Sequence, residues 1–358
     1  MIETQKPFLV STSIAIFISL YTIMPPYNFK TKRFIYLSCF KWYAISALMI
    51  VIIMSGLSLI RRHEIFLTFV PSTLLMWLDM STEIIGITNI IIFNMNSTLL
   101  KTKQWYKLFT KLGKIYVPLP QKYSSGCFIV VTITLLIIYI TFTLTYGLVS
   151  IYYFSYSLFY YAQFLLAFII YSITKPVRYR YFLLQTTLKH LQQISCLKDR
   201  LETLKTAEKV YLELNDIIEN FNDIFGWPIF GLMFNFGVML ITTLALSTTA
   251  TEINITVFYL LVTVATSIWP LVITFSCDLT TKEAQKIPQR CLKMEKKLIV
   301  TPEELAALRS FENRALVHVP KFTAAGFFEI NRVTLLTFIS NLATYFVVLM
   351  QLNSMFNK

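Results

Sequence analysis

The fold is decided by a stretch of 52 residues, 123–174, which reads YSSGCFIVVTITLLIIYITFTLTYGLVSIYYFSYSLFYYAQFLLAFIIYSIT and contains no Asp, Glu, Lys, Arg or His. A helix needs about 20 apolar residues to cross a bilayer. One helix cannot use this length, so the stretch predicts a hairpin of two membrane spans that turns near residues 147–157. The composition agrees, because only 14% of the 358 residues are charged, against about 25% in a typical soluble domain.

Charged residues delimit the other predicted spans, since an apolar block between charges is the usual sign of a membrane helix. Only Asp79 and Glu83 interrupt the second span, and Arg332 precedes the last. Together with the hairpin, these blocks predict an all-α protein with seven membrane spans. The blocks outside the hairpin are residues 42–60, 65–93, 224–251, 253–277 and 333–358.

Residues 7–29 form a further uncharged stretch that ends in Pro25 and Pro26. A cleaved signal peptide is not indicated, because no small-residue cleavage site is evident and Lys30 follows directly. The stretch is either an eighth span or a helix against the inner leaflet, and we favour the second interpretation.

The distribution of Lys and Arg predicts the topology. If the N-terminus is cytoplasmic, 29 of the 32 Lys and Arg residues fall on the cytoplasmic side, as the positive-inside rule requires. We therefore expect a multi-pass plasma-membrane protein with a cytoplasmic N-terminus and an extracellular C-terminus. This orientation is opposite to that of a G-protein-coupled receptor. The net charge of +13 does not indicate nucleic-acid binding, because the basic residues flank apolar blocks.

Two segments are predicted to form helices on the cytoplasmic side. Residues 176–222 keep an apolar spacing of three and four residues and so predict extensions of the spans on either side. In residues 278–320, Thr301 followed by Pro302 is typical of a helix start. These helices could bundle and form an oligomer interface. The predicted domains are an inner-leaflet helix at 1–29, a peripheral ligand-binding domain at 30–277 with its extension at 176–222, anchor helices at 278–332 and a pore-lining span at 333–358.

No enzyme signature is present: the sequence has no phosphate-binding loop, nucleophile elbow, His-Glu-x-x-His or Cys-x-x-Cys motif. The three histidines share no spacing typical of metal ligands. We therefore expect no catalytic activity, no metal and no cofactor.

The C-terminal segment carries a family resemblance. It contains Ala324-Ala325-Gly326-Phe327 before the last span and then Thr344-Tyr345, five apolar residues and Gln351-Leu352. This resembles the C-terminal signature of the insect gustatory receptors, Thr-Tyr, five apolar residues and Gln-Phe, except that Leu352 replaces the usual Phe. Elsewhere the chain is similar to this family in plan rather than in motif.

The resemblance implies a ligand-gated, non-selective cation channel for a small-molecule tastant, either a sugar or a bitter compound. It also implies a tetramer in the membrane lipid, homomeric or with related receptors, in which the last helix of each subunit lines a central pore. The insect odorant receptors share this architecture and are an alternative. A transporter of a small solute is a second alternative, although no internal repeat is evident.

The last span has residues suited to a pore. Thr344, Val348, Gln351 and Met355 share one face of a helix, at spacings of four, three and four. An apolar ring at Val348 could gate by dewetting, and amides at Gln351 could replace part of an ion's hydration shell. Leu352 could narrow the outer mouth. The alternative is that these polar residues only join one span to another.

Asp79 and Glu83 lie one helical turn apart within the second span, where a carboxylate should face a cavity or a partner. Either Asp79 lies at the floor of a ligand pocket, or the pair belongs to a structural hydrogen-bond network. The remaining pocket candidates are aromatic or polar residues in the outer halves of the spans: Trp77, Tyr139, Tyr146, Tyr156, Tyr160, Gln163, Tyr259 and Trp269.

Overall fold

The computed structural model describes residues 24–25, 27–28, 33–34, 37–69, 73–114, 130, 132–133, 154–191, 194, 196–249, 253–295 and 301–356. These residues form eight α-helices, one π-helical turn and two short antiparallel hairpins. In chain order the elements are β1 Tyr27–Asn28, β2 Arg33–Phe34, α2 Leu37–Phe69, α3 Thr73–Asn94, η1 Met95–Leu100, α4 Thr102–Lys114, α6 Phe154–His190, α7 Leu197–Thr249, α8 Ile253–Glu295, α9 Pro302–Val317, β3 Thr323–Ala324, β4 Phe328–Glu329 and α10 Arg332–Phe356.

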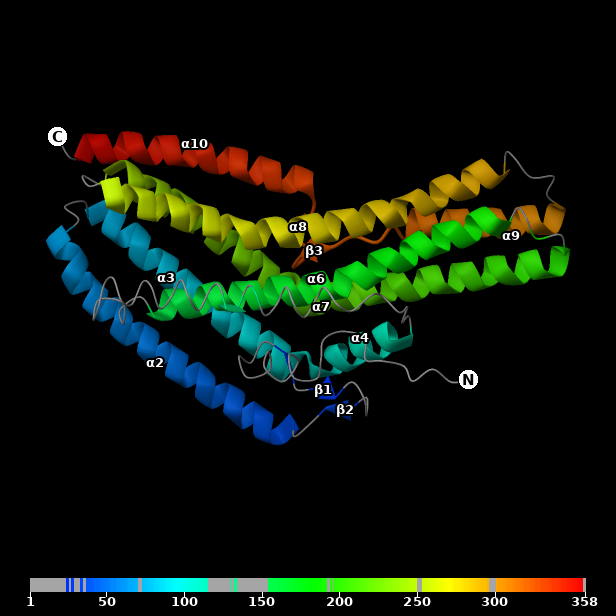
Figure 1. Ribbon diagram of the computed structural model, residues 1–358, viewed down its shortest axis with the longest axis horizontal. Coiled ribbons are helices and arrows are strands. Elements are labelled where there is room, and N and C mark those ends of the chain that lie inside the picture. Colours follow the sequence, from blue (N-terminus) through cyan, green and yellow to red (C-terminus); the bar gives the residue numbers. More distant parts are fainter. Residues whose placement is uncertain are drawn as a thin grey trace.

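The helices form one elongated bundle with two ends (Figure 1). At one end lie the C-terminal end of α10 and the junction of α7 with α8. At the other end, the C-terminal halves of α6 and α8 and the N-terminal half of α7 lie around α9, and we call this the basic end. The pore candidate α10 lies along one edge of the bundle and α2 along the opposite edge.

Six of the described helices are long and apolar enough to cross a membrane: α2, α3, α6, α7, α8 and α10. The predicted all-α membrane fold is thereby confirmed. The first span of the predicted hairpin, and the stretch 7–29 apart from a few residues, lie outside the described residues. The second span differs from its prediction, because α2 continues to Phe69 and α3 begins only at Thr73. In the sequence, Pro71 falls between the two helices, and a proline has no amide hydrogen for a helical bond.

The segments predicted to extend the spans are helical in the described structure. Helix α6 runs on to His190, and α7 starts at Leu197. Helix α9 begins with the predicted cap: the Thr301 hydroxyl accepts from the Glu304 amide, and the Glu304 carboxylate accepts from the Thr301 amide. Arg200 of α7 also pairs with Glu304 at 2.8 Å.

Two contacts set the pairing of α3 with α7. Asn89 lies so close to Gly231 that a Cβ atom there would be 2.2 Å from the Asn89 Oδ1. Asn96 lies seven residues after Asn89, and its side-chain amide donates to the carbonyl of Ile224, seven residues before Gly231, at 2.8 Å. The two helices are therefore antiparallel with matched spacing.

The bond from Asn96 compensates for a proline. Helix α7 is continuous through Pro228, which has no N–H for the carbonyl four residues earlier, that of Ile224. A carbonyl without a donor is costly inside a membrane. The side chain of Asn96 supplies that donor. The asparagine therefore replaces the hydrogen bond that Pro228 cannot make.

This pairing predicts energetic coupling between the two positions. Asn96→Ala should lower the free energy of unfolding by about 1–2 kcal/mol, measured by SDS titration in mixed micelles. The same substitution should cost clearly less beside Pro228→Ala, because the new alanine amide bonds the Ile224 carbonyl.

Asn220→Ala is the matched control, since Asn220 donates to the Asp216 carbonyl within an uninterrupted part of α7. Its effect should be the same with and without Pro228→Ala. Equal effects of Asn96→Ala in both backgrounds would contradict the compensation.

Candidate functional site

Helix α10 is attached to the body by one narrow face. Leu335 and Leu342 are buried, and Phe338 packs against Phe236 of α7. A Cβ atom at Gly237 would lie 2.8 Å from the Phe338 ring. The missing side chain at residue 237 therefore makes room for α10.

Further toward the C-terminus the same face continues. Phe346, Leu349 and Met350 pack against a small buried cluster formed by Met76, Ala245 and Leu246. The cluster joins α10 to the ends of α3 and α7 on the side away from the basic end. The contact face of α10 thus runs the length of the helix.

The predicted pore residues lie on the other face of α10. Thr344 and Gln351 are exposed, and Val348 keeps 47% of its surface exposed. Leu352 at 44% and Tyr345 at 64% are exposed beside them. Only 11% of the apolar window of α10 is buried within the chain. Met355 lies on the helix, but its side chain is outside the described residues.

Val347 is as open as Val348, with 53% of its surface exposed. Successive residues differ by about 100° around a helix, so Val347 lies to one side of the row formed by Thr344, Val348 and Gln351. The exposed face is therefore broad, and its centre is polar.

The N-terminal end of α10, which we call its base, is held by a helix cap and by ion pairs. Asn331 caps the helix by accepting from the Thr334 amide at 2.8 Å. The next residue, Arg332, pairs with the buried Asp278 of α8 at 2.9 Å and lies over the ring of Phe275. Lys282 also pairs with Asp278. A shift of α8 would therefore pull directly on the first turn of the candidate pore helix.

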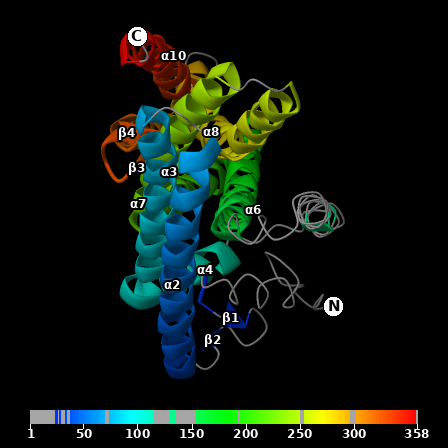
Figure 2. The same cartoon turned by 90° about the vertical axis from the view of Figure 1, so that its left-hand side faces the viewer.

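The hairpin β3–β4 lies between α9 and α10 beside α7 (Figure 2). The register pairs Thr323 with Glu329 and Ala324 with Phe328. Its turn uses Ala325 and Gly326 at positive φ, 52° and 79°, where glycine is favoured. Asn222 of α7 holds the first strand by accepting from the Thr323 amide at 3.0 Å.

The two acidic residues of α3 differ in how deeply they are buried. Glu83 is buried at 5% exposure, and Asp79 is half-buried. The Thr82 hydroxyl donates to the Asp79 carbonyl at 2.6 Å. Of the two carboxylates, Asp79 is thus the more accessible to a ligand.

Three of the predicted pocket residues reach the interior of the bundle. Gln163 is buried, Tyr160 donates to the Met239 sulfur of α7 at 3.9 Å, and Trp269 of α8 packs against Phe164 at 5.2 Å. Trp77 does not join them, since 65% of its surface is exposed. Tyr139 and Tyr146 lie outside the described residues. Tyr156 and Tyr259 lie on α6 and α8, but their side chains are not among those described.

The prediction from sequence missed several interior polar groups. Asn235 of α7 is fully buried, and neither of its amide atoms has a hydrogen-bond partner among the described residues. The Asn89 Oδ1 is also without one. The hydroxyls of Thr243 and Thr263 meet at 2.7 Å between α7 and α8. An asparagine inside an apolar span was the available signal, because intramembrane polar groups are rare and functional.

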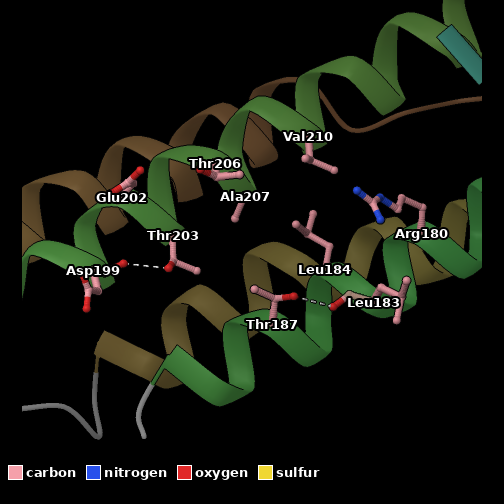
Figure 3. A pocket seen from close by; sticks show the side chains of 10 residues that line it. All are labelled: Arg180, Leu183, Leu184, Thr187, Asp199, Glu202, Thr203, Thr206, Ala207 and Val210. Atoms are coloured by element: carbon pink, nitrogen blue, oxygen red, sulfur yellow. Dashed lines mark hydrogen bonds between the residues drawn. The ribbon is translucent and has the colours of Figure 1, made fainter. Parts of the chain in front are cut away.

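None of the predicted pocket residues lines either of two hollows in the described part of the chain. One, of about 380 Å³, lies between α6 and α7 toward the basic end (Figure 3). Arg180 stands at one end of it, and Asp199 and Glu202 stand at the other. The second lies at the base of α10.

The described helices define a multi-span α-helical membrane protein. A profile of the 7tm chemosensory receptor family matches residues 10–356, so the chain belongs to that family. This is a family of receptors rather than of enzymes. No curated protein matches the sequence.

Solved structures show the same fold. The insect olfactory receptor OR5 from Machilis hrabei superposes with a TM-score of 0.60 at 14% sequence identity, over 95% of this chain and 97% of that one. The structure of the same receptor in complex with eugenol gives a TM-score of 0.58 with the same identity and coverage.

The two carboxylates of α3 should respond differently to neutralisation. Asp79→Asn should shift the concentration of ligand that gives a half-maximal response, with surface expression near normal. Glu83→Gln should mainly lower surface expression, because the buried carboxylate is part of the packed interior. Surface biotinylation and current recording on the same cells separate the two effects. Loss of expression with unchanged sensitivity for Asp79→Asn would place Asp79 in a structural network instead.

Proposed function

We propose that the chain is a gustatory receptor that acts as a ligand-gated, non-selective cation channel, with a central pore lined by α10 of four subunits. The observation that carries the proposal is the division of α10 into two faces. Leu335, Leu342 and Phe346 face the subunit's own body, whereas Thr344 and Val348 face away from it. After Arg332 the helix carries no charge, and fourfold assembly would bring its exposed polar row to a shared axis.

The chemistry of the row suits weak cation selectivity. Residues 333–357 contain no charge, so ions would meet hydroxyl and amide oxygens rather than an acidic ring. Four copies of Val348 would form an apolar ring one turn from a ring of Gln351 amides. A closed apolar constriction excludes ions because water leaves it.

We place the ligand site among α3, α6, α7 and α8, because each of α3, α6 and α7 carries a polar residue within the bundle: the half-buried Asp79, the buried Gln163 and the buried Asn235. The solved eugenol complex of the Machilis receptor, whose fold this chain shares, supports a small organic ligand. Helix α7 would carry the signal. It contacts the proposed site through Asn235 and contacts α10 only two residues later, at Gly237.

We further propose that the basic end is cytoplasmic and supplies the anchor between subunits. Its helices are held together by specific polar contacts. Arg314 of α9 pairs with Glu208 of α7 at 3.0 Å, and the Tyr211 hydroxyl donates to the last carbonyls of α9, those of Ala315 and His318, at 3.1 Å. A rigid anchor of this kind would keep four subunits in register while the membrane helices move.

The C-terminal pattern of Thr344, Tyr345 and Gln351 favours a gustatory role over an odorant role. The four subunits would be four copies of this chain, or this chain together with related receptors. Expression alone in oocytes, with sugars and bitter compounds applied in turn, tests the class of ligand. A ligand-dependent current carried by both Na⁺ and K⁺ is the expected result. Ligand-dependent uptake of solute without current would indicate a transporter.

The proposed orientation predicts how epitope tags are stained. A tag after Lys358 should be stained on intact cells, and a tag before Met1 only after permeabilisation. Staining of the N-terminal tag on intact cells would mean that residues 7–29 cross the membrane.

The proposed gate predicts that Val348→Ser or Val348→Asn raises current in the absence of ligand, because polar side chains let water return to the constriction. Gln351→Ala should instead alter conductance or cation preference, since it removes an amide without wetting the gate. Both are measured in single-channel recordings from excised patches.

The same substitutions at Val347 are the control, because Val347 lies about 100° around the helix from Val348. The exposed fractions of the two valines are similar, so the comparison tests on which side of the helix the gate lies rather than how exposed each side chain is. Equal effects at both positions, or no effect at either, would place the gate on another face of α10.

A further inference from the structure

A groove of about 310 Å³ lies where α10 leaves the body of the chain. Its walls come from four elements: the hairpin, the first turns of α10, Met233 of α7 and Thr274 of α8. It is separate from the proposed ligand site, because it lies at the base of α10 next to Asn331. The residues of α10 and the hairpin that line it are Phe328, Glu329, Ile330, Asn331, Val333, Thr334, Leu335, Thr337, Phe338 and Asn341.

Thr274 is the distinctive residue of this groove. It is buried at 1% exposure, and its hydroxyl has no hydrogen-bond partner among the described residues. Other buried threonines of these helices behave differently: Thr266 donates to the Thr263 carbonyl and Thr280 to the Ser276 carbonyl. A buried hydroxyl without a partner is unfavourable, so the Thr274 hydroxyl is available to a group that enters the groove.

The rest of the groove sets the polarity of its ligand. Met233, Phe328, Ile330, Leu335 and Phe338 make the inner wall apolar. The charges at its rim are already engaged, since Glu329 pairs with Lys321. Arg332, next to the groove, pairs with Asp278. A charged ligand would find no counter-ion, whereas an apolar ligand with one hydrogen-bonding group would match both the wall and Thr274.

We propose that this groove binds a neutral single-chain amphiphile, an alkyl chain that carries one hydroxyl or carbonyl group. The volume is at the lower end of the range of small-molecule sites, about 300–1,000 Å³, and suits a short chain. Arg332 marks the boundary of the membrane at this level, so the ligand enters from the leaflet on the basic side. Its chain lies between α10 and the pair α7 and α8, and its polar group meets the Thr274 hydroxyl.

Occupancy of this groove would act on α10 directly. The ligand would contact Phe338, the residue that seats α10 against Gly237, and would lie one turn from the Arg332–Asp278 pair. It is therefore a modulatory site, distinct from the site of the activating ligand. The binding claim does not depend on the channel function.

The test is photolabelling of the purified full-length protein in nanodiscs with 3-azioctanol, followed by proteolysis and mass spectrometry. The label should concentrate on peptides that contain residues 328–341, and excess octan-1-ol should suppress it. Thr274→Val, which keeps the shape and removes the hydroxyl, should reduce this labelling several-fold. Thr334→Trp, which fills the groove from α10, should abolish it.

Thr266→Val is the matched control, because Thr266 is equally buried but bonds within its own helix and does not line the groove. It should leave the labelling unchanged. Monodisperse elution of every variant shows that the fold is intact. Labelling that spreads over the lipid-facing helices, resists octan-1-ol or is unaffected by Thr274→Val would overturn the proposal, as would protection of residues 328–341 by a second copy of the chain.

Discussion

The structure depends on a single continuous helix. Helix α7 has 53 residues, or about 80 Å of length at 1.5 Å per residue, and so extends through the membrane and well beyond it. It contacts α3, α4, α6, α8, α9, α10 and the first strand of the second hairpin. Because these elements all pack on one rigid helix, a displacement at any position along α7 would also move the elements that contact it.

The contacts of α7 change in kind along its length. At the basic end they are polar and specific, as in the pairing of Tyr181 with Asn215 at 2.9 Å. Near Pro228 the backbone of Gly226 packs against the backbone of Ala325, and the side-chain amide of Asn96 donates to the Ile224 carbonyl. Beyond Gly231 the interior holds amides and hydroxyls without a full set of partners. The basic end is thus held by specific polar contacts, whereas the packing next to α10 leaves polar groups such as the Asn235 amide without a partner among the described residues.

Much of the fold could be predicted from the sequence because the bilayer imposes a simple rule: apolar length and flanking charge mark each span. The described helices fit that rule, and the Thr301 cap and the start of α10 at Arg332 were also predictable from local residues. The end of the first span before Arg61 agrees with the apolar part of α2, Cys39–Ile60. The start of the second span was misplaced, because it was set just after the charges at Arg61 and Arg62, whereas α3 begins only at Thr73.

The site was less predictable, because it depends on which helix faces which. Periodicity identified the row of Thr344, Val348 and Gln351, but only the packing of Leu342 and Phe346 shows that this row faces away from the subunit. The partnership of Asn96 with Pro228 joins residues 132 positions apart in the sequence, and no local pattern reveals it. Trp77 illustrates the reverse case, since an aromatic residue in an outer half-span can point outward as readily as inward.

The central claim is that the free face of α10 is completed by three more copies of itself. Electron cryomicroscopy of the purified full-length protein in nanodiscs tests this most directly. The account predicts a fourfold assembly in which Thr344, Val348 and Gln351 of each subunit lie nearest the axis, with Leu342 and Phe346 turned toward their own subunit. A monomer, or an assembly in which α10 faces lipid at the periphery, would contradict it.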